Sequence, residues 1–68
     1  MIINKRVGRT FKFILMNGDV ITGEVRVNNA FRDSDAIREE LKERFITVKT
    51  RTNVILLNRD YIREIKIA

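Results

Sequence analysis

The sequence predicts a single, mainly β domain in which one short helix interrupts five strands. A turn signal, Asn17-Gly18, separates two apolar β-type segments in the first half of the chain, as in a hairpin. The apolar residues then change to a helical spacing over residues 34–44. Three further β-type segments follow at residues 45–50, 54–57 and 62–67. The expected order within a single domain, residues 1–68, is therefore strand, strand, helix, strand, strand, strand.

The first two strands are expected to form an antiparallel hairpin. Residues 10–16 are rich in Phe and Ile and precede the turn, and residues 19–27 follow it. Asn and Gly both tolerate positive φ, so Asn17-Gly18 predicts a type I′ turn. Gly23, inside the second strand, indicates a bulge, a sharp bend or a close backbone approach. Alternation puts Phe11, Phe13 and Leu15 on one face of the first strand, whose other face also carries apolar groups, and it points Ile21, Val25 and Val27 the same way from the second strand.

The helix is expected at residues 34–44. Ile37, Leu41 and Phe45 recur every four residues and would form one apolar stripe. Acidic and capping residues at its start and basic residues in its last turn suit the two ends of a helix dipole. They are Asp33, Ser34 and Asp35 at the start, and Lys42 and Arg44 at the end.

The last three strands are short. Residues 45–50 have β-type composition, and residues 51–53 provide a tight connection to the next strand. Residues 54–57 are apolar on both faces, and residues 58–60 form a turn before the final strand at residues 62–67.

Size and composition limit how the fold is stabilised. The chain has 68 residues, no Cys and no His, and a domain of this size buries only about 60% of its unfolded surface. Without Cys there is neither a disulfide nor a thiolate metal site. We therefore expect a tight apolar core, oligomerisation, or both. No apolar run reaches the length of about 20 residues that spans a bilayer, so we expect a cytoplasmic protein without a membrane partner.

The charge balance is basic. Fourteen Lys and Arg against nine Asp and Glu give a net charge of +5, which favours polyanions such as nucleic acid or an anionic membrane surface. The alternative is a scattered, solvated basic surface. Residues 1–9 carry Lys5, Arg6 and Arg9 and fit either a basic arm or the first part of a strand.

The sequence contains no catalytic constellation that we recognise. Ser34 is the only Ser, and no His is present to activate it. The acidic residues Glu39, Glu40 and Glu43 fit the solvated face of the helix. The three Gly residues lie too far apart for a phosphate-binding loop. We therefore expect a protein that is not an enzyme and that uses no cofactor and no metal.

Three segments resemble the Sm and Sm-like protein family. The segment from Phe13 to Val25, with Asn17-Gly18 and Gly23, resembles the first Sm motif. Residues 45–49 resemble the third strand of the family's bacterial RNA chaperones, and residues 56–65 resemble the second Sm motif. The resemblance implies a small, strongly bent, five-stranded antiparallel barrel, with the helix inserted between strands two and three. The family's Asp before the third strand has no clear counterpart, and Asn58-Arg59 replaces its Arg-Gly pair.

The resemblance also implies a function and a site. Sm-like proteins bind single-stranded RNA at the inner rim of a ring, through the loops before strands three and five. This places Phe45 as a base-stacking aromatic and Asn58, Arg59 and Asp60 as a polar rim. Lys49 shares the expected face of Phe45, where a Lys could hold a phosphate. The alternative for Phe45 is packing on the helix residues Ile37 and Leu41, or on a partner.

Assembly is expected on two grounds. A two-sided apolar edge strand such as residues 54–57 invites association unless it is paired. The resemblance implies rings in which strand four of one subunit pairs with strand five of the next, hence a homo-oligomer. The alternative function is a structural or protein-interaction module, in which the barrel is an assembly unit and the helix at 34–44 is a surface for a protein partner.

Overall fold

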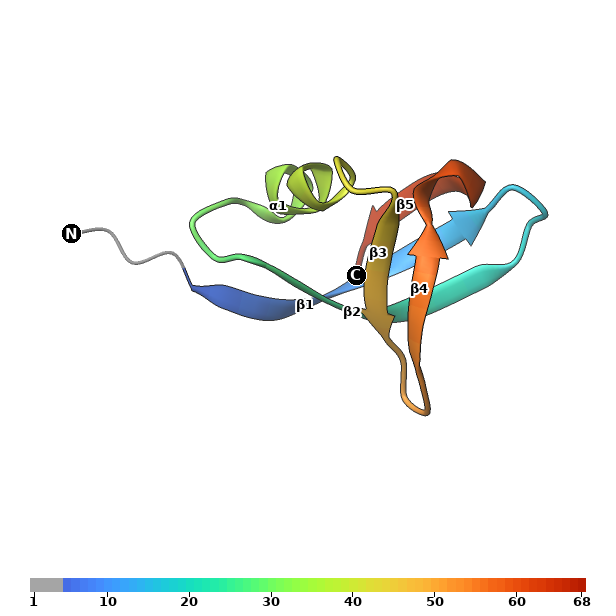
Figure 1. Cartoon of the computed structure of the whole chain (residues 1–68), viewed down its shortest axis with the longest axis horizontal. Coiled ribbons are helices and arrows are strands. Elements are labelled where there is room, and N and C mark those ends of the chain that lie inside the picture. The colour runs from blue at the N-terminus through green and yellow to red at the C-terminus, as the bar shows by residue number, and fades with distance from the viewer. Residues whose placement is uncertain (1–4) are drawn as a thin grey trace.

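The computed structural model of the chain describes residues 5–68, and Figure 1 shows its strands and helices. One antiparallel sheet of five strands, in the order β4-β3-β2-β1-β5, contains every strand of this part of the chain. The mainly β architecture and the helix between the second and third strands confirm the predicted element order. The elements are β1 (Arg6–Leu15), β2 (Val20–Asn28), α1 (Asp33–Glu40), β3 (Phe45–Lys49), β4 (Val54–Asn58), the 3₁₀ helix η1 (Arg59–Tyr61) and β5 (Ile62–Ile67).

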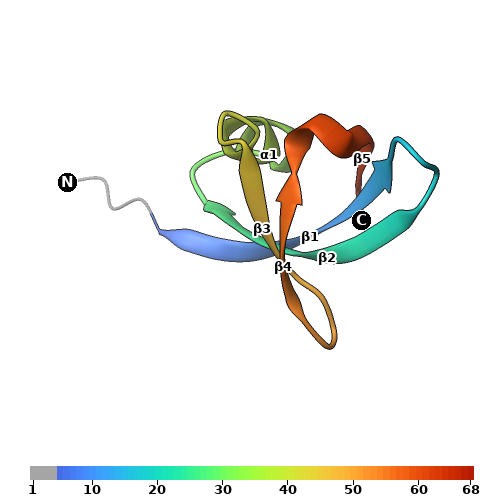
Figure 2. The same cartoon turned by 45° about the vertical axis from the view of Figure 1, so that its right-hand side comes forward.

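The sheet is strongly bent and open. β1 and β2 pair along their whole length, from Arg6 opposite Asn28 to Ile14 opposite Val20. β2 and β3 pair only at Glu24 and Lys49, so the β3–β4 hairpin crosses the long β1–β2 ribbon (Figures 1 and 2). Within residues 5–68, β4 and β5 do not pair with each other and form the two edges of the sheet. The expected closed barrel is therefore not confirmed.

Gly23 lies where β2 crosses β3. A Cβ atom at this position would be 2.5 Å from Val48 Cγ1 and 2.9 Å from the carbonyl oxygen of Lys49, closer than real Cβ atoms approach other heavy atoms. Gly therefore lets the two strands touch at the bend. The close backbone approach predicted for Gly23 is confirmed.

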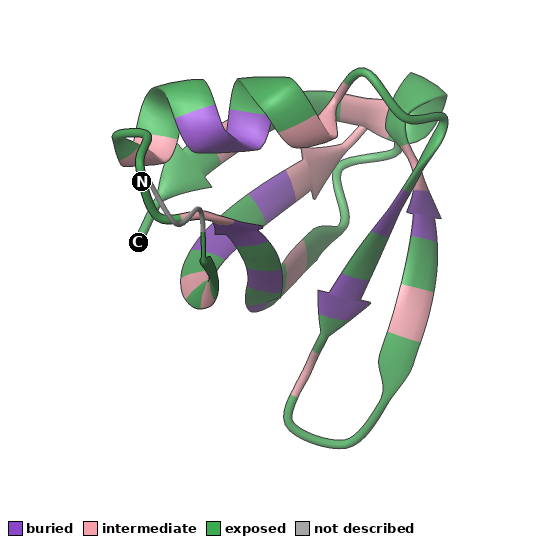
Figure 3. Ribbon diagram, turned by 60° about the vertical axis from the view of Figure 1, so that its left-hand side comes forward, coloured by how far each residue is buried: buried purple, intermediate pink, exposed green. Residues whose placement is uncertain are grey.

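The core lies between the sheet and α1. Along the strands, buried bands alternate with exposed ones, and the buried part of α1 faces the strands (Figure 3). We call the side of the sheet that carries the core its inner face, and the opposite side its outer face. Alternation in β1 and β2 is as predicted, with Phe11 and Phe13 fully buried. The core consists of Phe11, Phe13, Val25, Val27, Ala36, Ile37, Ile46, Val48 and Leu57.

The turn between β1 and β2 differs from the prediction. Gly18 has a φ of 91°, but no residue other than Gly has positive φ in the described part of the chain. A type I′ turn at Asn17-Gly18 is therefore wrong. The side chain of Asn17 explains the difference, because its Oδ1 accepts a hydrogen bond of 2.9 Å from the N–H of Asp19. The N–H of Leu15 donates to the carbonyl of Asp19, so Met16, Asn17 and Gly18 form a three-residue loop with Gly in the left-handed region.

The helix is shorter than predicted. It begins at Asp33 and ends at Glu40, and its N-cap, Arg32, makes no side-chain capping bond. Asp33 and Asp35 place the expected negative charge in the first turn. Residues 41–44 turn away from the helix, and Phe45 begins β3. The prediction that Phe45 continues the apolar stripe of the helix is therefore wrong.

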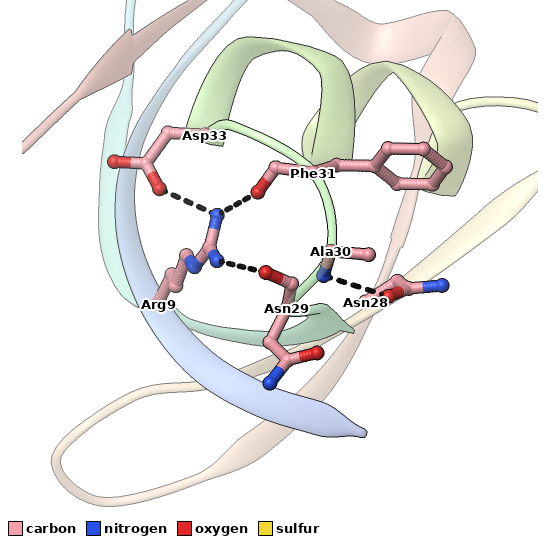
Figure 4. A network of polar contacts seen from close by, with 6 residues as sticks. All are labelled: Arg9, Asn28, Asn29, Ala30, Phe31 and Asp33. Atoms are coloured by element: carbon pink, nitrogen blue, oxygen red, sulfur yellow. Dashed lines mark hydrogen bonds and ion pairs between the residues drawn. The ribbon is translucent and has the colours of Figure 1, made fainter. Parts of the chain in front are cut away.

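Two basic residues near the N-terminus, Arg6 and Arg9, bond α1 and the loop before it to strand β1. Arg9 Nη1 donates to the carbonyl of Phe31 at 2.7 Å and to Asp33 Oδ1 at 2.8 Å (Figure 4). Arg6 forms an ion pair of 2.6 Å with Glu40 at the other end of α1. From Arg6 onward the segment is therefore part of a strand and not a free basic arm. Residues 1–4 of the segment lie outside the described residues.

Candidate nucleic-acid interface

Phe45 lies on the outer face of β3. Its neighbours Ile46 and Val48 are buried in the core, and alternation turns Phe45, Thr47 and Lys49 outward. The side chain of Phe45 is left 51% exposed. Ile37, one of the two helix residues on which Phe45 could have packed, is buried on the inner face, so Phe45 and Ile37 do not share a face.

A groove opens beside Phe45 because β2 and β3 diverge after their single contact. It has a volume of about 520 Å³. Phe45, Thr47 and Lys49 line it from β3, and Arg26 lines it from β2. Exposed cations and an aromatic ring therefore border one hollow on the outer face. The carboxylates of Glu24, Glu40 and Glu43 also line it, and Glu40 is paired with Arg6.

The predicted polar rim does lie next to Phe45. Asn58, the last residue of β4, is the direct cross-strand partner of Phe45. The N–H of Asp60 donates to Asn58 Oδ1 at 2.9 Å, which orders the turn that becomes η1. The carboxylate of Asp60 is exposed, and its ion pairs with Arg59 and Arg44 are long, at 3.8 and 4.0 Å. This carboxylate is therefore accessible to a ligand.

Arg59 has a structural task in this rim. Its Nη1 donates to the carbonyl of Leu41 at 2.8 Å and to that of Lys42 at 3.3 Å. Its backbone N–H donates to the carbonyl of Arg44. Carbonyls at the end of a helix need such donors, so Arg59 stabilises the segment that follows the helix. Substituting Arg59 would alter the fold as well as any contact with a ligand.

Lys49 lies apart from the other predicted site residues. It ends β3, four positions after Phe45, which corresponds to about 13 Å along a strand. There it is directly opposite Glu24 of β2. The structure therefore brings together Phe45, Asn58, Arg59 and Asp60, and it places Lys49 on the same face but at the other end of the strand.

Two outer-face cations were not predicted as part of the site. Lys12 on β1 lies directly opposite Lys66 on β5. The outward direction of Lys12 could have been inferred, because it stands between the core residues Phe11 and Phe13. Its pairing with Lys66 depends on the register of two strands from opposite ends of the chain, and no local pattern reports that register.

A second groove, with a volume of about 580 Å³, lies between α1 and the edge strand β5. It is lined by Ile37 and Leu41 from the helical segment and by Ile62, Ile65 and Ile67 from β5. Charged side chains, among them those of Arg38 and Arg63, also line it. An apolar surface beside a free strand edge is suited to association with another polypeptide.

Residues 5–68 contain no group of three or more Asp or Glu side chains placed to hold a metal ion. None of the helices formed by these residues is long and apolar enough to cross a membrane.

The fold and the site together define a small, open antiparallel β-sheet protein with a helix inserted between β2 and β3 and an exposed aromatic ring on the outer face. No family model, curated protein or solved structure matches the chain.

Proposed function

We propose that the chain is a non-catalytic, homo-oligomeric module that binds single-stranded RNA on the outer face of its sheet. The observation that carries the proposal is the 51% exposure of Phe45 on a strand that also presents Lys49. Single-stranded bases stack on such aromatic rings, and Lys and Arg hold the phosphates. The arrangement is the one that the Sm-like resemblance implies, with Phe45 as a base-stacking aromatic and Asn58, Arg59 and Asp60 as a polar rim.

The groups around Phe45 suit a base that is splayed out from a single strand. Asn58 is its cross-strand neighbour, and the carboxylate of Asp60 follows in the same turn. Amide and carboxylate groups recognise the edges of unstacked bases by hydrogen bonds. Three carboxylates line the groove and disfavour a phosphate inside it. The base therefore occupies the groove, and the backbone runs along the cations at its border, beginning with Lys49.

Phe45→Ala is expected to weaken binding of single-stranded RNA about 5- to 150-fold, because stacking contributes roughly 1–3 kcal/mol per base. Fluorescence anisotropy with U-rich and A-rich RNA, and with DNA as a control, measures the change. The fold is expected to be retained, since the ring lies outside the core. Circular dichroism and thermal unfolding of the variant check this.

Phe31→Ala is the matched control for this experiment. Phe31 is also a partly exposed aromatic residue, at 38%, but it precedes α1 and lies outside the β2–β3 groove. Its substitution is expected to leave RNA affinity unchanged. Equal affinities of the wild-type chain and the Phe45 variant for every RNA would refute the proposed site.

A second candidate function is a structural assembly unit that binds proteins and no RNA. The observation that favours it is the apolar groove between α1 and β5, beside a free strand edge. In this version, β4 of one copy pairs with β5 of the next, and the exposed side of α1 receives a protein partner. The exposed side of α1 is mixed in charge, and its Glu39 forms an ion pair of 3.0 Å with Lys42, two residues beyond the end of the helix. Absence of RNA binding together with self-association would favour this candidate.

A further inference from the structure

The outer face of the sheet holds two lysines together on β1 and the edge strand β5. Lys12 and Lys66 are directly opposite each other on β1 and β5, and such residues share a face with Cβ atoms about 5 Å apart. Lys12 is fixed in this direction because its neighbours Phe11 and Phe13 are both fully buried. Both lysines are exposed.

The positive charges of Lys12 and Lys66 are poorly balanced by carboxylates of the described residues. Like charges directly opposite each other in a sheet destabilise it. Among residues 5–68, no carboxylate forms an ion pair with Lys12, and Lys66 reaches only Glu64, at 3.9 Å. That pair is half exposed, and exposed pairs contribute little. The face therefore carries a positive potential that a bound anion would lower.

The cationic surface continues from the lysine pair toward Phe45. Lys12 is directly opposite Thr22 of β2, and Thr22 lines a shallow hollow together with Lys49 and Arg51. Neither Lys49 nor Arg51 forms an ion pair with any of the described carboxylates. Lys49 in turn shares its face of β3 with Phe45. The cations thus lead across the sheet from β3 to β5.

Glu24 is the acidic residue that interrupts this surface. It lies directly opposite both Thr10 and Lys49. Its carboxylate, however, lies over Gly8, where a Cβ atom would collide with it. Gly8 is on the far side of Thr10 from Lys12. The carboxylate is therefore turned away from the lysine pair and leaves it unneutralised.

We propose that Lys49, Arg51, Lys12 and Lys66 form a track that binds the phosphate backbone of the RNA strand. The identity of the polyanion rests on the proposed function, because Phe45 lies on the same face and supplies the contact to a base. The track itself contains no aromatic residue, and its cations neutralise phosphates without reading sequence. Its threonine hydroxyls, Thr10 and Thr22, are further donors for phosphate oxygens.

The test is the salt dependence of RNA binding by Lys12→Gln/Lys66→Gln. Each phosphate contact on a single strand contributes about 0.7 to the slope of log K against log salt. Losing two contacts is expected to reduce that slope by about 1.4 and to weaken binding about tenfold at roughly 0.15 M salt. The thermal midpoint is expected not to fall, because the variant removes a like-charge pair. A merely structural role for the two lysines would lower it.

Arg38→Gln/Lys42→Gln is the matched control, since it removes the same net charge from the helical segment. For this control, the slope of log K against log salt in RNA binding is expected to stay at the wild-type value. Equal loss of slope in both double variants would overturn the proposal, because net charge alone would then explain binding. Competition by poly-glutamate as strong as that by RNA of equal charge would also overturn it, by showing a general surface for acidic polymers.

The same titrations separate this inference from the proposed base site. If Phe45→Ala binds RNA like the wild type while Lys12→Gln/Lys66→Gln shows a smaller slope of log K against log salt, the track is supported and the base site fails. If Phe45→Ala weakens binding while the lysine variant keeps the full slope, the track is overturned and the base site is supported.

Discussion

Gly23→Ala is expected to lower the free energy of unfolding by about 3 kcal/mol. The added methyl group would lie 2.5 Å from Val48 Cγ1 and 2.9 Å from a backbone carbonyl oxygen. The carbonyl belongs to Lys49, at the only point where β3 pairs with β2, so neither neighbour moves without opening the bend. In a domain of this size the loss is a large part of the total stability. Urea unfolding followed by circular dichroism measures it.

Gly8→Ala provides the comparison. Gly8 is exposed on β1, and the three heavy atoms nearest to an added methyl group all belong to the flexible side chain of Glu24. In the variant, the Glu24 side chain turns away from the added methyl group into solvent. The free energy of unfolding is therefore expected to change by no more than about 0.5 kcal/mol. Equal stabilities of the two Ala variants would show that β2 and β3 do not touch at Gly23.

Leu56→Lys is expected to weaken self-association about 100-fold. Leu56 is 67% exposed on β4, an edge of the open sheet, and burying a leucine contributes roughly 2–3 kcal/mol. A Lys on an edge strand opposes pairing with another chain. The folded single chain is expected to keep its stability. Sedimentation velocity over a concentration series measures the change.

Val20→Lys is the control for assembly, because Val20 is 55% exposed but lies on β2, an interior strand. This variant is expected to associate like the wild type. A wild-type chain that stays monomeric at submillimolar concentration would refute the proposed oligomer. Equal loss of association in the two Lys variants would show that the contact is not made by the β4 edge.

Most of the fold could be predicted because it follows from local patterns. Alternation around Phe11 and Phe13 placed the core face of β1, and Gly23 marked the bend. The errors arose where distant groups decide the local structure. Beyond the helix end at Glu40, Arg59, far along the chain, donates to the carbonyls of the segment that was predicted as helix. The open edges of the sheet depend on how β3 and β4 diverge from β2, which no local pattern reports.

The candidate site could likewise be predicted only where local patterns decide it. The outward direction of Phe45 followed from the apolar residues Ile46 and Val48 that alternate with it. Composition does not reveal what a guanidinium binds, so the structural task of Arg59 was missed. The Lys12–Lys66 pair was missed for a related reason, because it exists only through the register of β1 and β5.

The central claim, that single-stranded RNA binds the outer face at Phe45, is tested most directly by nuclear magnetic resonance. A ¹⁵N-labelled chain is titrated with a short U-rich RNA, and the shift of each backbone amide is followed. The proposal predicts that the largest shifts fall on residues 45–49 and 58–60, with smaller ones at Lys12 and Lys66. Shifts confined to the groove between α1 and β5, or no shifts at all, would contradict it.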